Sequence, residues 1–336
     1  MTFFRSRMFV LTVVGVLFFL CVSLHSESPI DQSDIVSIKS LDGKLRVEIN
    51  GELFTEYVYE DTPRPILYPV IGPHGIAMTR NFPMKKDVKG EAQDHPHHRS
   101  LWFTHGLVNG VDFWSEGPKT GKIVQDKILK TTGGPKCGSI QTSNKWLGPD
   151  GKVRCTDTRT TSFEVLPDGR IIDFEITIHA SEGDLTLGDT KEGSMAIRTH
   201  PNLRLSNDPK GGVTTANGQA LNSEGVSGKD LWGKRARWVD YWGKIDEKTV
   251  GVAIFDHPDN PRYPTWWHAR DYGLIAANPF GAHNFEGKPK GAGDMVIKAG
   301  ESVTFRWRFL FHQGNAQQAK IALHYLQYAE PKPVSK

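Results

Sequence analysis

The chain of 336 residues has almost no net charge, few cysteines and only one long apolar run. Lysine and arginine number 41 against 38 aspartate and glutamate, an excess too small to favour nucleic acid or an anionic membrane as a partner. The apolar run, residues 8–20, is shorter than a typical membrane span. The remaining composition is that of an ordinary soluble globular protein. We therefore expect no nucleic-acid partner and no stable membrane insertion once the N-terminal segment is removed.

Familiar catalytic and cofactor-binding motifs are also missing. The chain has no Gly-x-Ser-x-Gly elbow, no phosphate-binding Gly-x-x-x-x-Gly-Lys-Ser/Thr loop and no convincing dinucleotide fingerprint. These absences argue against a serine hydrolase of that type and against nucleotide-dependent chemistry. We therefore predict no cofactor, with a divalent metal as the one alternative.

The N-terminus has the pattern of an export signal. Arg5 and Arg7 precede the apolar run, and small or polar residues such as Ser23 and Ser26 follow it. We predict that residues 1–26 are a signal peptide and that the protein is periplasmic or secreted, with an uncleaved anchor as the alternative. Residues 27–330 are predicted to form a single domain, and residues 331–336 a short loose tail.

Two cysteines remain after the predicted cleavage, Cys137 and Cys155. Two isolated cysteines make a poor metal site, and neither lies among the histidines. In an oxidising compartment they could close a loop of about 18 residues, which would contribute about 3 kcal/mol by chain-entropy arguments. We therefore predict a disulfide between them.

Strand signals dominate the rest of the chain. Residues 35–59 alternate apolar and polar side chains between Asp-Gly and Asn-Gly turns, residues 163–179 have the pattern of a hairpin, and residues 302–311 place five large apolar side chains on one face. Helix signals are nearly absent until Asn315, a plausible N-cap. The sequence predicts an all-β protein, a large antiparallel β-sandwich with one C-terminal helix.

One stretch, residues 94–106, gathers four of the chain's thirteen histidines with an aspartate and an arginine. Imidazole is well suited to moving protons or holding a transition metal near neutral pH. If the stretch is extended, His95, His97 and Arg99 point to one side, and Asp94, His98 and Trp102 to the other. The alternative is a polar loop whose histidines only bond to their neighbours.

Three later stretches also concentrate reactive groups: residues 198–202, 231–243 and 256–283. The spacing His-x-Arg, which occurs at 97–99, recurs at 268–270 and pairs a proton carrier with a fixed positive donor. That pairing suits negative charge that develops on oxygen. The residues predicted to be catalytic are His97, His98, Arg99, His268 and Arg270. The residues predicted to bind substrate are Asp94, Trp102, His105, Asp112, Trp114, His200, Asn202, Trp238, Asn278 and His283.

A metal site is the competing interpretation of the same histidines. Zinc, copper or iron would need about three convergent nitrogens, often with a carboxylate. The candidate ligands are His95, His97, His98 and His200, although no spacing matches a motif with firm metal geometry.

Several motifs together resemble a known family. They occupy residues 94–103, 110–114, 198–202, 222–225 and 277–281, and the match extends over about residues 35–312. The sequence resembles exported bacterial proteins abundant in planctomycetes, a family labelled methane oxygenase PmoA or domain of unknown function. The resemblance implies a β-sandwich of the galactose-mutarotase type, whose relatives mostly handle carbohydrates.

The methane-oxidation part of that label is not supported by this sequence. A methane monooxygenase subunit of that name would cross the membrane several times, whereas this chain has one apolar segment. Seven of the nine tryptophans lie in residues 102–114 and 232–267, where they could form flat platforms for ligands.

We therefore predict an exported carbohydrate-active enzyme whose histidine and arginine cluster transfers protons. The reaction would be of the epimerase, lyase or glycoside hydrolase type, with His97 or His98 as acid or base and His268 as the counterpart. The substrate would be a small molecule or an oligosaccharide. The alternatives are a metal-dependent enzyme, such as an oxygenase, and a non-catalytic carbohydrate-binding protein.

Overall fold

The N-terminal part of the domain is the strand meander that the sequence predicts. The computed structural model describes Met1 and residues 34–330, and within them β1 (Ile35–Leu41), β2 (Lys44–Ile49) and β3 (Glu52–Val58) pair in sequence order. Asn50 and Gly51 both have positive φ, 54° and 82°. A two-residue hairpin turn of this kind requires such values, which is why Asn-Gly is favoured there.

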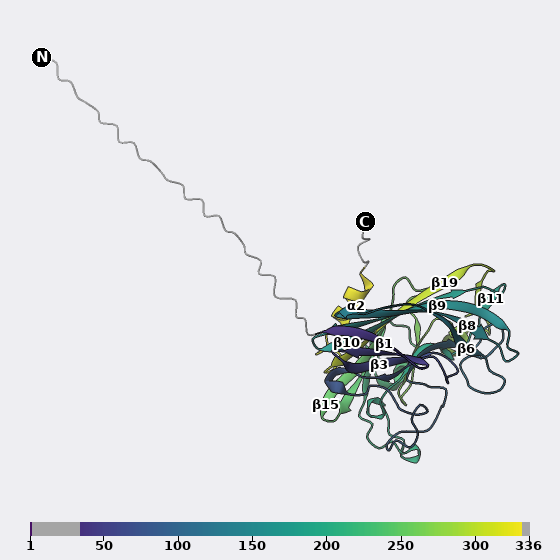
Figure 1. Cartoon of the computed structure of the whole chain (residues 1–336). Coiled ribbons are helices and arrows are strands. Elements are labelled where there is room, and N and C mark those ends of the chain that lie inside the picture. Colours follow the sequence, from purple (N-terminus) through teal and green to yellow (C-terminus); the bar gives the residue numbers. More distant parts are fainter. Residues whose placement is uncertain (2–33, 331–336) are drawn as a thin grey trace. The chain divides into compact units, whose positions relative to one another are not determined.

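These strands belong to a nine-stranded antiparallel sheet, called here the first sheet (Figure 1). The strand order is β16 (Trp266–Ala269), β17 (Leu274–Asn278), β12 (Gly193–Arg198), β5 (Leu101–His105), β4 (Ile66–Val70), β3, β2, β1 and β7 (Gly134–Pro135). The first four of these strands, β16, β17, β12 and β5, carry most of the candidate site.

An eight-stranded antiparallel sheet, called here the second sheet, packs against the first. Its order is β13 (Gln219–Asn222), β14 (Trp238–Ile245), β15 (Lys248–Asp256), β19 (Ser302–Gln313), β10 (Gly169–His179), β9 (Val153–Leu166), β8 (Cys137–Leu147) and β6 (Lys122–Thr132). A two-stranded sheet joins β11 (Leu185–Leu187) to β18 (Met295–Ile297).

Aromatic side chains from both large sheets meet in the core between them. The ring of Phe103 in the first sheet lies 5.9 Å from Phe174 and 5.7 Å from Trp307 in the second. The hairpin β9–β10 and strand β19 turn alternate apolar side chains into this core, as their sequence pattern predicts. The predicted fold class, a large antiparallel β-sandwich, is confirmed.

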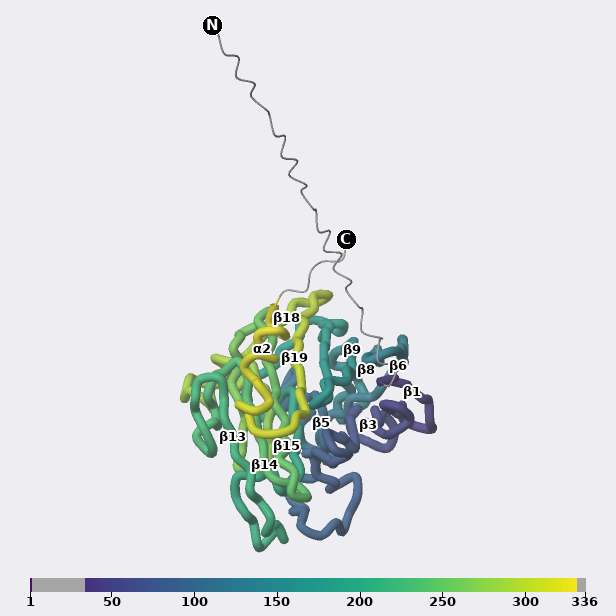
Figure 2. Tube along the Cα trace, turned by 90° about the vertical axis from the view of Figure 1, so that its left-hand side faces the viewer, coloured from purple at the N-terminus to yellow at the C-terminus, as the bar shows by residue number. Residues whose placement is uncertain are grey.

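The predicted C-terminal helix is present, although it starts later than expected. Helix α2 (Ile321–Ala329) packs Ile321 and Tyr325 against Phe255 and Leu310 on the second sheet, and Figures 1 and 2 show it in yellow beside β19. Asn315 does not cap this helix. Its side chain accepts two backbone N–H bonds within the preceding turn instead.

The remaining helical elements are short and were not expected. They are α1 (Ala282–Glu286) and the 3₁₀ turns η1 (Pro73–Gly75), η2 (Pro201–Leu203), η3 (Pro209–Gly211) and η4 (Gly228–Leu231). Three of these 3₁₀ turns start with proline, whose fixed φ suits the first helical position.

The predicted disulfide is wrong. Both cysteines are free, Cys137 exposed and Cys155 buried. They lie at opposite ends of the β8–β9 ladder, since Cys155 pairs with Trp146, nine residues along β8 from Cys137. At the rise of an antiparallel strand this places them about 30 Å apart, far beyond the reach of a disulfide.

The predicted signal peptide and C-terminal tail lie outside the described residues. Within the described part, no helix has both the length and the apolar character needed to cross a membrane. The described residues from 34 onward belong to one unit of the chain.

Candidate active site

A row of four side chains crosses the outer face of the first sheet. Trp102 pairs with Ala196, Ala196 with Ala276, and Ala276 with His268 on β16. Because side chains alternate along a strand, this row faces away from the core, into which the residues next to it turn. Two alanines separate the indole from the imidazole, and all four side chains of the row are buried.

The histidine stretch covers part of this face as a turn, not as the extended strand that we expected. The N–H of His98 donates to the carbonyl of His95 over 2.9 Å, and Pro96 and His97 occupy the turn between them. The three rings therefore cluster: that of His98 lies 4.8 Å from His95 and 4.5 Å from His97. The predicted alternation of His95 and His97 against His98 is wrong.

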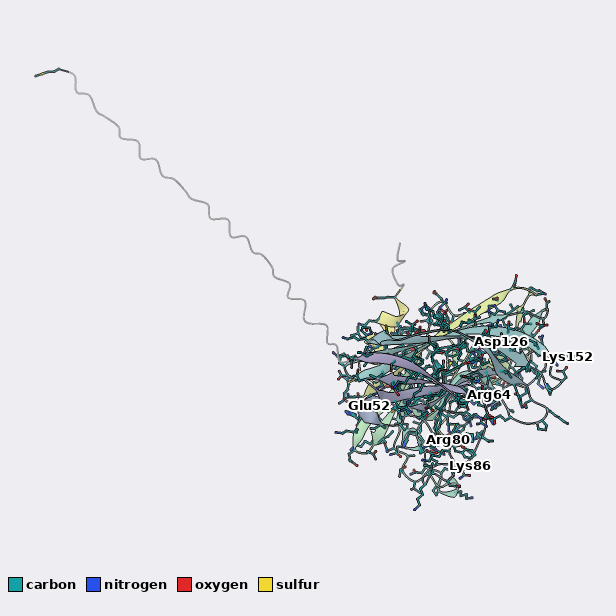
Figure 3. All side chains as sticks on the ribbon, viewed as in Figure 1. Glu52, Arg64, Arg80, Lys86, Asp126 and Lys152 are labelled. Atoms are coloured by element: carbon teal, nitrogen blue, oxygen red, sulfur yellow. The ribbon has the colours of Figure 1, made fainter. Side chains whose placement is uncertain are left out.

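Two buried arginines hold the backbone of this turn (Figure 3). The guanidinium of Arg80, 2% exposed, donates to the carbonyls of Ala92, Asp94 and His95. Arg64, equally buried, donates to the carbonyl of His97 over 3.0 Å. Buried carbonyls need such partners, so these arginines fix the shape of the histidine turn.

A third buried arginine, Arg198 on β12, connects the turn to the sheet. It donates to both carboxylate oxygens of Asp94, over 2.8 and 3.0 Å, and to Nδ1 of His98 over 3.0 Å. Arg80 and His95 also bind the Asp94 carboxylate. Burial alone would raise the pKa of Asp94, but the hydrogen bond from His95 and the charges of Arg198 and Arg80 hold it well below its usual value. Asp94 is therefore a fixed anion.

His98 is buried and neutral, with a defined tautomer. Its ring stacks on Trp102 at 5.5 Å, and burial together with the charge of Arg198 holds its pKa well below the usual value. Because a guanidinium can only donate, Nδ1 of His98 must accept, and the ring proton lies on Nε2. His98 thus presents an N–H donor.

His268 presents the opposite group. Its Nδ1 lies 2.9 Å from the carbonyl of Lys191, to which it must donate. Nε2 therefore carries the lone pair, and it is buried without a partner among the described residues. Burial and the charges of Lys191 and Arg270 lower the pKa of His268 to about 3. The imidazole is therefore a neutral acceptor at neutral pH.

His95, His97 and Tyr272 form the more accessible part of the cluster. The Tyr272 ring stacks on His95 at 5.1 Å. His97 is half-buried, and its ring forms no hydrogen bond within the described residues. Burial and the charge of Arg64 lower the pKa of His97 to about 4. The charge of His95 also contributes to the low pKa of His268.

The two predicted His-x-Arg pairs differ. Arg99 donates to both carboxylate oxygens of Glu116, over 2.7 and 2.8 Å. Its charge is therefore already paired. Arg270 follows His268 by two residues, just beyond the end of β16, and its guanidinium carbon lies 5.4 Å from the centre of the Tyr272 ring. In the described part of the chain its guanidinium donates no hydrogen bond and forms no ion pair. Only the second pair offers a free cation beside an imidazole.

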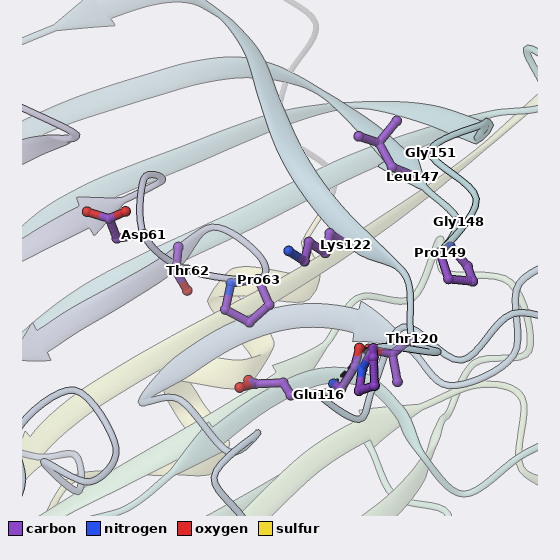
Figure 4. Close-up of a pocket in the computed structure, with 12 residues that line it drawn as sticks. Asp61, Thr62, Pro63, Glu116, Thr120, Lys122, Leu147, Gly148, Pro149 and Gly151 are labelled. Carbon is purple, nitrogen blue, oxygen red and sulfur yellow. Dashed lines mark hydrogen bonds between the residues drawn. The ribbon is translucent and has the colours of Figure 1, made fainter.

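A large cavity opens on the far side of Glu116. It has a volume of about 860 Å³ and is lined by residues from three segments, 61–63, 116–122 and 147–151, which Figure 4 shows in close-up. Neither His98 nor His268 lines it. Because Glu116 is held by Arg99 and Arg64, this cavity adjoins the histidine turn without containing its reactive atoms.

The three tryptophans predicted to bind substrate are buried. Trp102 and Trp114 are both 1% exposed and lie beneath the histidines, with ring centroids 5.4 Å apart. Asp112 accepts the N–H of Trp114 over 2.7 Å and so shapes the loop that carries this indole. Trp238 does not reach the site, because it packs on the second sheet in the cluster under α2.

Other predicted residues support neighbouring loops. His105 is buried between the carbonyl of Gly188 and the ring of Phe280, and burial lowers its pKa to about 4. Asn278 donates to the carbonyl of Thr190, next to the Lys191 carbonyl that orients His268. These contacts position the site without contributing a free reactive group.

Three further predicted residues lie outside the cluster. Nδ1 of His200 accepts the N–H of Asn202, and the amide of Asn202 donates to the carbonyl of Lys244. Nδ1 of His283 lies 2.6 Å from the carbonyl of Lys288. The structure therefore brings His268 and Arg270, but not His200, to the face that bears the early histidines.

The four metal candidates do not all lie together. Among the described residues, no group of three or more histidine, cysteine, aspartate or glutamate side chains is arranged to hold a metal ion. His200 lies apart from the other candidates, and the rings of His95 and His98 are parallel, with an interplanar angle of 4°. Of the four metal candidates, His95, His97 and His98 have their rings within 4.5 to 5.8 Å of one another.

Sequence reasoning missed four residues that organise the site: Arg64, Arg80, Arg198 and Tyr272. Arg198 stood in a stretch that the sequence singled out, residues 198–202, but nothing marked it as buried. Tyr272 lies in the turn between β16 and β17, where the strand spacing that paired His268 with Arg270 no longer applies.

A family model matches residues 44–325, and its description is a family of unknown function, DUF6807. No curated protein matches the chain.

Several solved structures are similar in fold. A galactose mutarotase related enzyme from Lactobacillus acidophilus is 10% identical, with a TM-score of 0.32, over 82% of this chain and 97% of that one. A galactose mutarotase-like protein from Lactobacillus casei is 8% identical, with a TM-score of 0.31, over 82% and 100%. A glycoside hydrolase family 97 enzyme variant from Pseudoalteromonas is 9% identical, with a TM-score of 0.34, over 90% and 38%. These values are too low to support any inference about activity.

Proposed function

The chain belongs to the family of unknown function DUF6807, and from its site we propose that it is a carbohydrate-active enzyme of the proton-transfer, epimerase-like type. One observation carries the proposal. Two imidazoles are buried and neutral, His268 on β16 and His98 in the turn stacked on Trp102, and their partners fix opposite tautomers. One imidazole offers an N–H donor and the other a lone pair, which are the two groups needed to remove a proton and stabilise the resulting charge.

In this proposal His268 is the base. Its Nε2 takes a proton from a carbon next to a carbonyl or carboxyl group, and the electrons of the broken C–H bond move onto the adjacent oxygen. Nε2–H of His98 donates a hydrogen bond to that oxygen, and the charge of Arg270 stabilises it. Protonated His268 then returns the proton to the carbon. Return to the same face gives exchange with solvent, and return after the deprotonated intermediate has turned its other face to His268 gives the epimer.

His98 acts as a hydrogen-bond donor and does not itself release a proton. Loss of the Nε2 proton from a neutral imidazole would leave an imidazolate, which is far too basic to form readily. A neutral imidazole that donates to a developing oxyanion is an established catalytic device. Arg198 supports this role because it holds Nδ1 as the acceptor.

The arrangement does not favour glycoside hydrolysis by two carboxylates. Such hydrolases need one free carboxylic acid and one free carboxylate across the scissile bond. On this face, Asp94 is bound by Arg80 and Arg198. Glu116 is bound by Arg99 and Arg64. Neither carboxylate is available as a proton donor.

The assignment to carbohydrates is supported by the sequence motifs and by the character of the site. Accessible aromatic rings of His95 and Tyr272 lie beside free hydrogen-bonding groups. Flat rings pack against the apolar C–H faces of sugars, and the polar groups bind hydroxyls.

Deuterium exchange tests the proposal. The purified protein is incubated in D₂O with a panel of aldoses, ketoses and uronic acids, and loss of individual C–H signals is followed by proton NMR. We expect exchange with at least one sugar, reduced about 10²–10⁴-fold in His268→Gln. His283→Gln is the matched control, because that histidine lies outside the cluster. Exchange that is equal in wild type and His268→Gln would overturn the role of His268.

A further inference from the structure

A small hollow lies at the end of β16, the strand that carries the proposed base. It has a volume of about 320 Å³ and is lined by Lys229, Trp232, Ala269, Arg270 and Asp271. This is the lower end of the size range of ligand pockets and suits a single sugar ring or part of one. The hollow lies next to β16, the strand that carries His268. His268 does not line the hollow, and its link to the hollow is Arg270, which follows it by two residues.

The charges around this hollow leave one cation uncommitted. Asp271 is paired with Lys229 at 3.3 Å, and its carboxylate also accepts the hydroxyl of Ser206 over 3.1 Å. Arg270, by contrast, has no hydrogen-bond or ion-pair partner within the described residues. A half-buried guanidinium with free donors is suited to bind a planar anion through two parallel hydrogen bonds.

Trp232 adds a neutral donor and a flat surface. The indole is half-buried, and its Nε1 is buried without a partner among the described residues. Its ring lies 5.4 Å from Phe285, whose ring lies 6.2 Å from that of His268. The hollow is thus joined to the proposed base by a short chain of aromatic contacts.

We propose that Arg270 and this hollow bind the anionic group of the substrate, so that the substrate is an acidic sugar. This inference rests on the proposed function and specifies its substrate class. The anion can be the carboxylate of a uronic acid or a sulfate ester, since both present oxygens that match a guanidinium. Arg270 lies just beyond the end of β16, and its backbone N–H still donates to the carbonyl of Leu274 on the neighbouring strand. Residues two apart in extended backbone lie about 7 Å apart, so an anion on Arg270 would be near the strand end that carries His268.

The uronic acid fits the proposed chemistry directly. Its acidic C–H bond is on the carbon that bears the carboxylate, so a carboxylate held by Arg270 brings this C–H toward His268. A bound anion also offsets the positive charges of Lys191 and Arg270, which contribute to the low pKa of His268. Substrate binding would therefore make His268 a stronger base.

Calorimetric titration tests this inference separately from turnover. The full chain with His268→Gln, which cannot take up the proton, is titrated with glucuronate, galacturonate, glucose 6-sulfate, glucose and galactose. We expect at least one anionic sugar to bind about tenfold or more tightly than its neutral counterpart. Adding Arg270→Gln should reduce this preference to about twofold or less, and Arg270→Lys should retain part of it. The control, Lys244→Gln, removes a charge at an exposed position on β14.

Each outcome decides between the alternatives. Tight binding of the sulfated sugar alone supports an acidic sugar and identifies sulfate as the anion. Equal binding of charged and neutral sugars, no binding of any acidic sugar, or a preference that survives Arg270→Gln would overturn the inference. Arg270-dependent binding of uronates without deuterium exchange in the wild type would overturn the proposed function and leave the anion site standing.

Discussion

Replacing Arg198 by methionine should destabilise the fold strongly, whereas the same change at Arg270 should not. Arg198 is 1% exposed and binds both Asp94 and His98. Removing one partner of a buried ion pair typically costs about 3–5 kcal/mol. Asp94 is 31% exposed and keeps Arg80 and His95, so we expect the lower end of this range, about 3 kcal/mol.

Arg270→Met is the matched control for this prediction. Arg270 is half-buried and forms no hydrogen bond or ion pair within the described residues. Substitutions at such positions usually change stability by about 0.5 kcal/mol or less. Loss of Arg198 should also allow the His98 proton to move between the two ring nitrogens, because nothing else described donates to Nδ1.

Urea unfolding followed by tryptophan fluorescence measures both variants. The slope of the transition should be unchanged, so a shift in midpoint reports the change in the free energy of unfolding directly. If Arg198→Met were within about 1 kcal/mol of Arg270→Met, Arg198 would not be the buried link that we describe between the histidine turn and β12.

Three further predictions concern pH and thiol chemistry. The pKa of His268 is about 3 in the fold and ordinarily 6.5, so its contribution to stability is full above pH 6.5 and falls below it. At about pH 5 the free energy of unfolding should be lower by about 2 kcal/mol. Urea unfolding of His268→Gln should not show this decrease. Burial alone would lower the pKa of His312, but the charge of Asp240 raises it, so this contribution is full below pH 6.5 and is lost as pH rises through the folded pKa. Asp240→Asn should cost about 3–5 kcal/mol near neutral pH, and a cost below about 1 kcal/mol in urea unfolding would show that the pair is not needed. Under non-reducing conditions a thiol reagent should modify Cys137 in the native protein and Cys155 only in denaturant. If neither cysteine reacted in denaturant, the two would be joined in a disulfide and our correction would be wrong.

Local patterns were sufficient to predict the strands and turns. Asn50-Gly51 and the alternation in β10 and β19 are short-range signals, and the structure confirms them. The late helix was also visible, although its start was not, because Asn315 caps a turn just before it. Where the pairing of distant strands decides the outcome, local patterns do not suffice.

The candidate site shows this limit clearly. The row from Trp102 through Ala196 and Ala276 to His268 depends on the register of four strands that are far apart in sequence. The alanines of this row carry no chemical signal of their own. Sequence could therefore name His268 but could not predict its relation to Trp102.

Burial of charged residues was equally invisible. Arg80 and Arg198 look like surface residues in the sequence, yet they hold the histidine turn from inside. The Cys137–Cys155 prediction failed for a related reason. Separation along the chain was small, but the β8–β9 ladder extends the two ends away from each other.

The most direct test of the account is the tautomeric state of two imidazoles. Long-range ¹⁵N–¹H correlation spectra of the histidine-labelled protein, assigned with His98→Gln and His268→Gln, distinguish a proton on Nδ1 from one on Nε2. We predict that near neutral pH both rings are neutral, with the proton of His98 on Nε2 and that of His268 on Nδ1. The same tautomer in both rings, or a protonated imidazolium at either position, would contradict the complementary donor and acceptor on which the proposed function depends.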